Sequence, residues 1–130
     1  MVCGESIDLG NADGWYSSEC NDVIALITYR IAESTMEILL LDSLHKNNGI
    51  GTALLDRALM TARECGCRRI ILITTNDNLP ALRFYQKRGF DMVRLYHNAL
   101  DQARRIKPGL SVLGMDGIPL RREIELELNL

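Results

Sequence analysis

The spacing of hydrophobic residues changes along the chain, and the change separates predicted strands from predicted helices. Two apolar runs, Val23–Ile31 and Met36–Leu41, predict strands. Gly14–Glu19 is a weaker strand candidate, and Cys20–Asp22 supplies residues suited to the hairpin turn that follows it. The chain is therefore expected to begin with a β-hairpin and one further strand.

A helical period replaces the strand pattern near residue 50. One helical stripe holds the apolar residues Ile50, Leu54, Leu55, Ala58, Leu59 and Ala62. Gly66 follows as a C-terminal stop signal. A shorter helix is expected over Leu79–Arg88, with Asn78 as its N-cap, Pro80 in its first turn and Gly89 at its end.

The remaining segments predict more strands around these helices. Arg69–Thr74 is a continuous apolar run, typical of a strand covered on both faces. Phe90–Tyr96 predicts another strand, and Arg122–Leu128 alternates between acidic and apolar residues as a final strand. His97–Ile106 predicts a short polar helix, and Lys107–Pro119 a glycine-rich loop. This order predicts an α/β (α+β) fold, in which helices pack against a mixed sheet.

Composition and charge exclude several classes of protein. A length of 130 residues suggests one domain, and 47% hydrophobic with 25% charged residues is the balance of a soluble globular protein. A net charge of −2 argues against a general nucleic-acid binder and a polybasic membrane anchor. The longest apolar run, Val23–Ile27, is far shorter than the roughly 20 residues of a membrane span. Because the first residues lack a signal-peptide pattern, we expect a cytoplasmic protein.

Cysteine and histidine spacing predicts no metal site. Cys65 and Cys67 form a CxC pair, which differs from the CxxC spacing of most zinc and redox sites. The histidines, His45 and His97, stand at unrelated positions. We therefore expect reduced, partly buried thiols and no bound metal.

A glycine-containing loop precedes the first predicted helix. Gly49 and Gly51 flank Ile50, where this helix is expected to start. Backbone N–H groups and the helix dipole favour phosphate at such a position, and glycine lets the backbone approach it closely. The loop contains neither a Walker A motif nor a Rossmann fingerprint. The residues by themselves are compatible with an anion-binding turn and with an ordinary turn.

A second segment, together with this loop, resembles the GNAT superfamily of acyl-CoA N-acyltransferases. The first match, to the family's R/Q-x-x-G-x-G-A/G loop, consists of Lys46, Asn47, Asn48, Gly49, Ile50, Gly51 and Thr52. The second match, to the family's NxxAxxFYxKxGF segment, consists of Asn78, Ala81, Phe84, Tyr85, Lys87, Gly89 and Phe90. The two matches occur in the family's order, and the resemblance covers residues 14–96.

The resemblance implies a mixed, mostly antiparallel sheet in which two parallel strands splay apart to hold the pantetheine arm of acetyl-CoA. Main-chain groups around Leu39 and Leu41 would bind pantetheine, and the amides of Asn47–Thr52 would bind the pyrophosphate. Lys46 stands where the family has arginine or glutamine, and its charge also favours phosphate. Among the matched residues of the second helix, Ala81, Phe84 and Tyr85 would contribute to the cofactor site. Asn78 is expected to bond a pantetheine amide, to cap the helix, or to do both.

The same resemblance implies direct acetyl transfer to a primary amine in a ternary complex. Tyr85 would be the general acid that protonates the departing CoA thiolate, with a packing role as the alternative. Two carboxylates, Glu37 and Asp42, are candidates for the general base, and the choice between them is open. The strand amide near Leu41 would polarise the thioester carbonyl. The acceptor is expected to be a small-molecule or peptide amine.

The resemblance also implies a shortened N-terminus. The family begins with a strand and two helices before the strand near Trp15, and here 14 residues precede that strand. We therefore expect residues 1–130 to form a single acetyltransferase-like domain that lacks these elements. Trp15–Glu19 would then be an exposed edge strand, which favours a homodimer, with strand exchange by Arg122–Leu128 as one route. The alternative is that the first 14 residues fold back over this gap. The alternative function is a non-catalytic acyl-CoA-binding or protein-interaction module.

Overall fold

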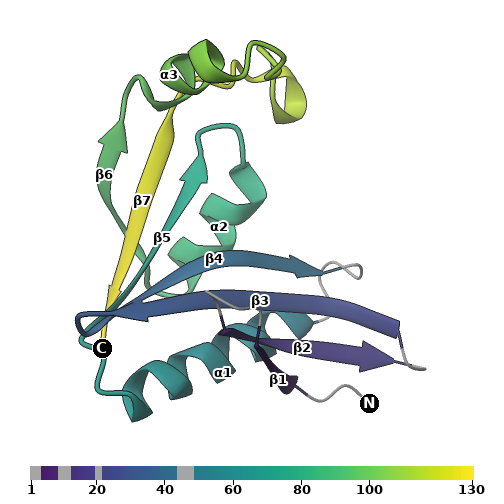
Figure 1. Cartoon of the computed structure of the whole chain (residues 1–130), viewed down its shortest axis with the longest axis vertical. Coiled ribbons are helices and arrows are strands. Elements are labelled where there is room, and N and C mark those ends of the chain that lie inside the picture. The colour runs from purple at the N-terminus through teal and green to yellow at the C-terminus, as the bar shows by residue number, and fades with distance from the viewer. Residues whose placement is uncertain (1–3, 9–12, 20–21, 44–48) are drawn as a thin grey trace. The chain divides into compact units, whose positions relative to one another are not determined.

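A computed structural model describes residues 4–8, 13–19, 22–43 and 49–130, and the chain divides into two compact units (Figure 1). The first unit comprises Met1–Ile71 with Asn129–Leu130, and the second comprises Leu72–Leu128. The elements are β1 (Gly4–Asp8), β2 (Asp13–Glu19), β3 (Asp22–Ala32), β4 (Thr35–Ser43), α1 (Ile50–Glu64), β5 (Arg69–Thr75), α2 (Leu79–Lys87), β6 (Asp91–Tyr96), α3 (Ala99–Ile106), the 3-10 turn η1 (Met115–Gly117) and β7 (Glu123–Asn129). We predicted from the sequence that residues 1–130 form one domain and that this domain lacks the two N-terminal helices of the family. Both stay predictions.

The first unit is an antiparallel run of strands, β1 to β4, with α1 packed against them (Figure 1). The apolar stripe predicted for this helix faces the strands: the buried residues of α1 are Ile50, Leu54, Leu55, Ala58 and Ala62. On the strands, Ile27 and Met36 are fully buried. Glu33 and Ser34 join β3 to β4 with φ angles of 50° and 65°, the positive values that a tight type I′ hairpin turn requires.

A strand precedes β2, and this corrects two expectations from the sequence. No strand was expected before Gly14, and Trp15–Glu19 was expected to be an exposed edge. Both expectations are wrong, because β1 pairs antiparallel with β2 from Gly4 opposite Ser17 to Asp8 opposite Asp13. The segment Gly4–Asp8 contains a single β-branched residue, so its own propensity did not reveal it. Backbone pairing with a neighbouring strand stabilises it instead.

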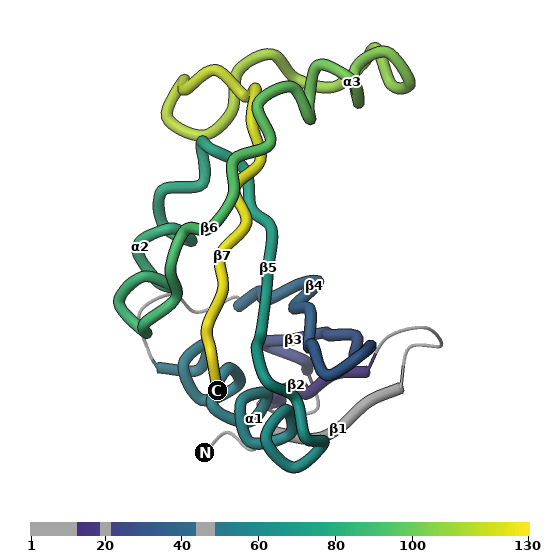
Figure 2. Tube along the Cα trace, turned by 90° about the vertical axis from the view of Figure 1, so that its left-hand side faces the viewer, coloured from purple at the N-terminus to yellow at the C-terminus, as the bar shows by residue number. Residues whose placement is uncertain are grey.

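The second unit places β7 between β5 and β6, and α2 runs along one face of these strands (Figure 2). Its buried apolar residues include Leu72, Leu82, Phe90 and Leu126. The predicted alternation of the last strand holds in part, since Leu126 is fully buried while Ile124 and Leu128 are half-buried. Neither α3 nor η1 contains a buried residue.

Two side chains at the end of β5 hold the long loop before β7. The Asn76 side chain donates to the Pro119 carbonyl and accepts from the backbone N–H groups of Arg121 and Arg122. The buried carboxylate of Asp77 accepts from the Met115 N–H at 2.8 Å. Burial by itself raises the pKa of Asp77, but hydrogen bonds from Thr75 and Met115 outweigh burial and lower this pKa overall.

We expect Gly114→Ala to destabilise the protein by about 1–3 kcal/mol, the usual cost of overpacking. A Cβ at this position would overlap the side chain of Asp77, which is buried and held by its hydrogen bond from Met115. The φ of Gly114, −100°, is open to any residue, so the effect would be steric. Gly109→Ala is the matched control, because a Cβ there meets nothing within 4 Å. Chemical denaturation measures both, and equal midpoints would contradict the prediction.

Candidate functional site

The N-terminus of α1 carries the geometry that the glycine-containing loop predicted. Gly49 is the N-cap, with φ 83° and ψ −3°, a left-handed conformation that glycine adopts without strain. Its carbonyl accepts from the Ala53 N–H at 3.0 Å and closes the first turn. Among the described residues, a Cβ built on Gly49 would meet nothing within 4 Å. The first turn of α1 also contains no acidic residue that would repel an anion.

The other residues predicted for this loop fall into two groups. Ile50 is buried and anchors the start of α1, while Gly51 and Thr52 are half-buried in its first turn. The predicted contacts of Lys46, Asn47 and Asn48 lie outside the described residues. The described part of the turn therefore supports an anion site through backbone groups and the helix dipole.

A β-bulge interrupts β4 at Leu39, one of the two residues predicted to offer main-chain groups to the cofactor. Tyr29 pairs with Ile38, and Thr28 pairs with Leu40, so Leu39 has no opposite residue on β3. The Leu39 side chain is 44% exposed, and Leu41 is half-buried. Bulges bend a strand, re-aim its groups and are common beside active sites. Sequence pattern did not reveal this bulge, because the run Ile38–Leu41 is apolar at every position.

Both candidate bases lie on β4. The Glu37 carboxylate accepts from the guanidinium of Arg30, its opposite residue on β3, at 2.9 Å. Asp42 is exposed, accepts from the Ser43 N–H at 2.9 Å and borders a hollow of about 200 Å³ with Leu40. Glu37 is thus paired with a cation of the neighbouring strand β3, whereas Asp42 lies at an open surface. This geometry leaves both as candidates.

The second predicted segment contains the N-cap of α2, the whole helix and the residues that follow it. Asn78 accepts from the Ala81 N–H at 3.2 Å, which confirms its predicted role as N-cap. Phe84 is half-buried, and the Arg88 guanidinium lies 3.8 Å from the centre of its ring. Asn78 therefore fixes where the helix begins, and this in turn sets the position of Tyr85 two turns later.

Tyr85 is the buried centre of an aromatic cluster on α2. The centre of its ring lies 5.1 Å from the centre of the Phe84 ring and 5.3 Å from that of Phe90, and both pairs are edge-to-face. The residue is 6% exposed, and this burial raises the pKa of Tyr85 to about 12. No hydrogen bond within the described residues engages its hydroxyl. A proton therefore stays on the hydroxyl well above neutral pH, and the group is available as a donor.

The predicted site residues are distributed over both units. Those on β4 and α1 belong to the first unit, and those on α2 belong to the second. Within the described residues, no group of three or more histidine, cysteine, aspartate or glutamate side chains is arranged to hold a metal ion. None of the described helices combines the length and the apolar character needed to cross a membrane.

Comparisons with a family model, with related sequences and with solved structures were made for the whole chain. Residues 7–90 match the model of the acetyltransferase (GNAT) family. The Bacillus subtilis protein YxbD is 49% identical over 106 residues, which is 82% of this chain and 67% of YxbD. An acetyltransferase structure from Bacillus cereus, described as an IAA acetyltransferase, has a TM-score of 0.85 at 21% identity and covers 100% of both chains. A GNAT family structure from Elizabethkingia anophelis with acetyl-CoA bound has a TM-score of 0.84 at 17% identity, covering 99% of this chain and 98% of that one.

Proposed function

We propose, because the chain belongs to the acetyltransferase (GNAT) family, that it transfers an acetyl group from acetyl-CoA to a primary amine. The observation that carries this proposal is the left-handed glycine N-cap at α1, where a Cβ would meet none of the described residues within 4 Å. The fold, a mixed and mostly antiparallel α/β arrangement, matches GNAT structures, one of which holds acetyl-CoA. The acceptor and the individual steps below belong to the proposal.

Binding of the pyrophosphate and of part of pantetheine is proposed for the first unit, and the predicted cofactor contacts of Asn78, Ala81, Phe84 and Tyr85 belong to the second. The N-terminal amides of α1 would hold the pyrophosphate, and none of the described side chains lies within 4 Å of a Cβ built on Gly49. The bulge at Leu39 frees a stretch of β4 from regular pairing with β3, which suits main-chain bonding to pantetheine. The splayed strand pair and the oxyanion donor near Leu41 remain parts of this proposal.

The proposed reaction begins with attack by a neutral amine on the thioester carbonyl. The tetrahedral intermediate then expels the CoA thiolate, and the Tyr85 hydroxyl supplies a hydrogen bond or a proton to the departing sulfur. An ordinary thiol has a pKa of about 8.5, so full transfer from a phenol with a pKa of about 12 is uphill by roughly 5 kcal/mol. Tyr85 therefore acts best as a hydrogen-bond donor to the charge that develops on sulfur.

Either Glu37 or Asp42 would remove the proton from the amine. Glu37→Gln and Asp42→Asn separate the two possibilities, since each removes one basic group with little change of shape. The variant that loses the base should show a steeper dependence of rate on pH, because the acceptor must then deprotonate in solution. Equal pH profiles for both variants and the parent protein would exclude both carboxylates.

Thiol release from acetyl-CoA in the presence of an amine panel tests the proposed function. The panel should contain small aliphatic amines, polyamines and short peptides with free N-termini, because both acceptor classes are open. Amine-dependent release above the rate of hydrolysis supports acetyl transfer. CoA binding, measured separately by calorimetry, without turnover on any amine would favour the alternative, a non-catalytic acyl-CoA-binding module.

We also propose a homodimer, on grounds that differ from those of the sequence analysis. An exposed edge at β2 cannot favour the dimer, because β1 pairs with β2 along this edge. In the second unit, β6 is the outer strand, and its Met92, Val93 and Leu95 side chains are 44–55% exposed. Exposed apolar side chains on an outer strand favour association. Sedimentation at micromolar concentration would contradict this if a 14.6 kDa monomer persists at every concentration.

A further inference from the structure

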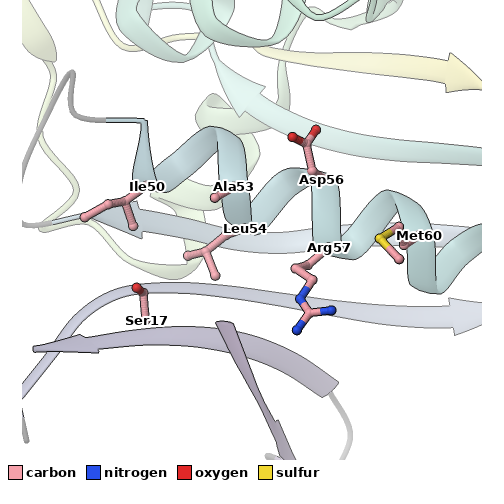
Figure 3. A pocket seen from close by; sticks show the side chains of 7 residues that line it. All are labelled: Ser17, Ile50, Ala53, Leu54, Asp56, Arg57 and Met60. Atoms are coloured by element: carbon pink, nitrogen blue, oxygen red, sulfur yellow. The ribbon is translucent and has the colours of Figure 1, made fainter. Parts of the chain in front are cut away.

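We propose that a hollow between β2 and α1 in the first unit binds a small apolar carboxylate (Figure 3). The hollow shares Ile50 with the turn proposed to bind the pyrophosphate, but it extends from there along the face of α1 that is turned toward β2. The hollow has a volume of about 310 Å³, within the range of small-molecule pockets. Its apolar lining includes Ile50, Leu54 and Met60 of α1. Three polar residues, Ser17, Asp56 and Arg57, also line it, and Ser17 and Arg57 decide which ligand fits.

Ser17 supplies a buried hydroxyl without a partner. Its side chain is 1% exposed, and its Oγ forms no hydrogen bond. Figure 3 shows this hydroxyl directed from β2 toward α1. A β-bulge between Ser17 and Ser18 shifts the pairing of β2 with β3 at this point. Buried hydroxyls are almost always hydrogen-bonded, so an unpaired one that lines a hollow indicates a missing acceptor or water.

Arg57 supplies a cation that is held in place without a counter-ion. Its guanidinium lies 4.6 Å from the centre of the Trp15 ring, and the Trp15 indole N–H donates to the Thr61 hydroxyl at 3.2 Å. Thr61 in turn donates to the Arg57 carbonyl at 2.9 Å, so the indole is tied to the helix that carries the arginine. Within the described part of the chain, no carboxylate pairs with Arg57. Asp56 also borders the hollow, but in Figure 3 its carboxylate points away from Ser17.

These groups together select the chemical class of the ligand. A carboxylate accepts from both a hydroxyl and a guanidinium, and charge-assisted bonds of this kind are strong. The apolar walls favour a hydrocarbon portion over a strongly hydrated phosphate. An ammonium group would be repelled by Arg57. A small aliphatic carboxylate therefore matches the apolar lining and pairs with the Arg57 cation, and the Ser17 hydroxyl is a second donor on the same lining.

Octanoate, 1-octanol and octylamine are matched probes for this site, since they differ in the head group alone. We expect calorimetric titration of the full chain to show octanoate binding at least tenfold tighter than 1-octanol, and octylamine weakest. Arg57→Met should weaken octanoate about tenfold or more, because the charge-assisted bond is lost. Ser17→Ala should weaken octanoate about three- to tenfold, as expected for one hydrogen bond. Arg63→Met, an exposed cation of the same helix outside the hollow, is the control and should bind like the parent.

A filling variant tests the place of binding independently. Ala53 borders the hollow and is exposed, so Ala53→Leu should occupy the space, leave folding intact and abolish octanoate binding. Octanoate should also bind undiminished in the presence of saturating CoA, which separates this site from the proposed function. No octanoate binding, equal binding of octylamine, unchanged affinity in Arg57→Met and Ser17→Ala, occupation by water alone, or displacement by CoA would each overturn the proposal.

Discussion

Replacing Tyr85 with phenylalanine should lower kcat for acetyl transfer by about 100-fold or more while CoA binding is kept. The hydroxyl is the proposed donor to the departing sulfur, and phenylalanine removes it without changing the shape of the ring. Because the pKa of Tyr85 is raised to about 12, its hydroxyl stays protonated across the neutral range. The parent rate should therefore show no loss from ionisation of this residue below about pH 10. Steady-state kinetics with the best amine of the panel measures both effects.

The same substitution should leave the fold intact, which separates chemistry from packing. No described residue bonds the Tyr85 hydroxyl, so phenylalanine leaves no buried partner unsatisfied and keeps the edge-to-face contacts with Phe84 and Phe90. Tyr96→Phe is the matched control: its hydroxyl donates to Glu125 at 2.7 Å and has no part in the proposed reaction, so kcat should not change. If Tyr85→Phe turns over at the parent rate, Tyr85 is a packing residue.

Gly49→Val should abolish the rise in thermal midpoint that CoA produces. A ligand that binds the folded state alone stabilises it by about 2.7 kcal/mol when its free concentration is 100 times its Kd. We expect the Gly49→Val protein to lose this stabilisation by CoA. Valine would place a branched side chain beside the α1 N-terminus, where the pyrophosphate is proposed to sit. Gly51→Val should act in the same direction, because it also places a branched side chain in the first turn of α1.

Gly66→Val controls for backbone strain. Gly66 follows the other end of α1 with φ +75°, and a Cβ there also meets nothing within 4 Å. Valine strains the backbone at either position, so both variants should unfold at lower temperature than the parent. CoA should still raise the midpoint of Gly66→Val. A folded Gly49→Val protein with parental CoA affinity would show that the pyrophosphate binds elsewhere.

Hydrophobic period by itself predicted most of the elements. The apolar stripe of α1 and the β-branched run of β3 are local patterns, and each has one compatible secondary structure. Capping residues predicted where α2 begins, since Asn78 can satisfy a first-turn N–H wherever this helix packs. The two GNAT-like segments are likewise recognisable from sequence, because each is a short run with particular residues at particular spacing.

Tertiary structure decided what depends on residues distant in the chain. The strand β1 exists through its pairing with β2, the bulge at Leu39 arises from the register of β3 against β4, and neither leaves a periodic signal. The unpaired hydroxyl of Ser17 and the stacking of Arg57 on Trp15 likewise need α1 to pack over β2. Sequence determined most of the elements and the two GNAT-like segments, because these follow from interactions within one turn or one strand. Packing determined the edges, the bulge and the second hollow, because each is set by contacts between elements whose register the local pattern does not encode.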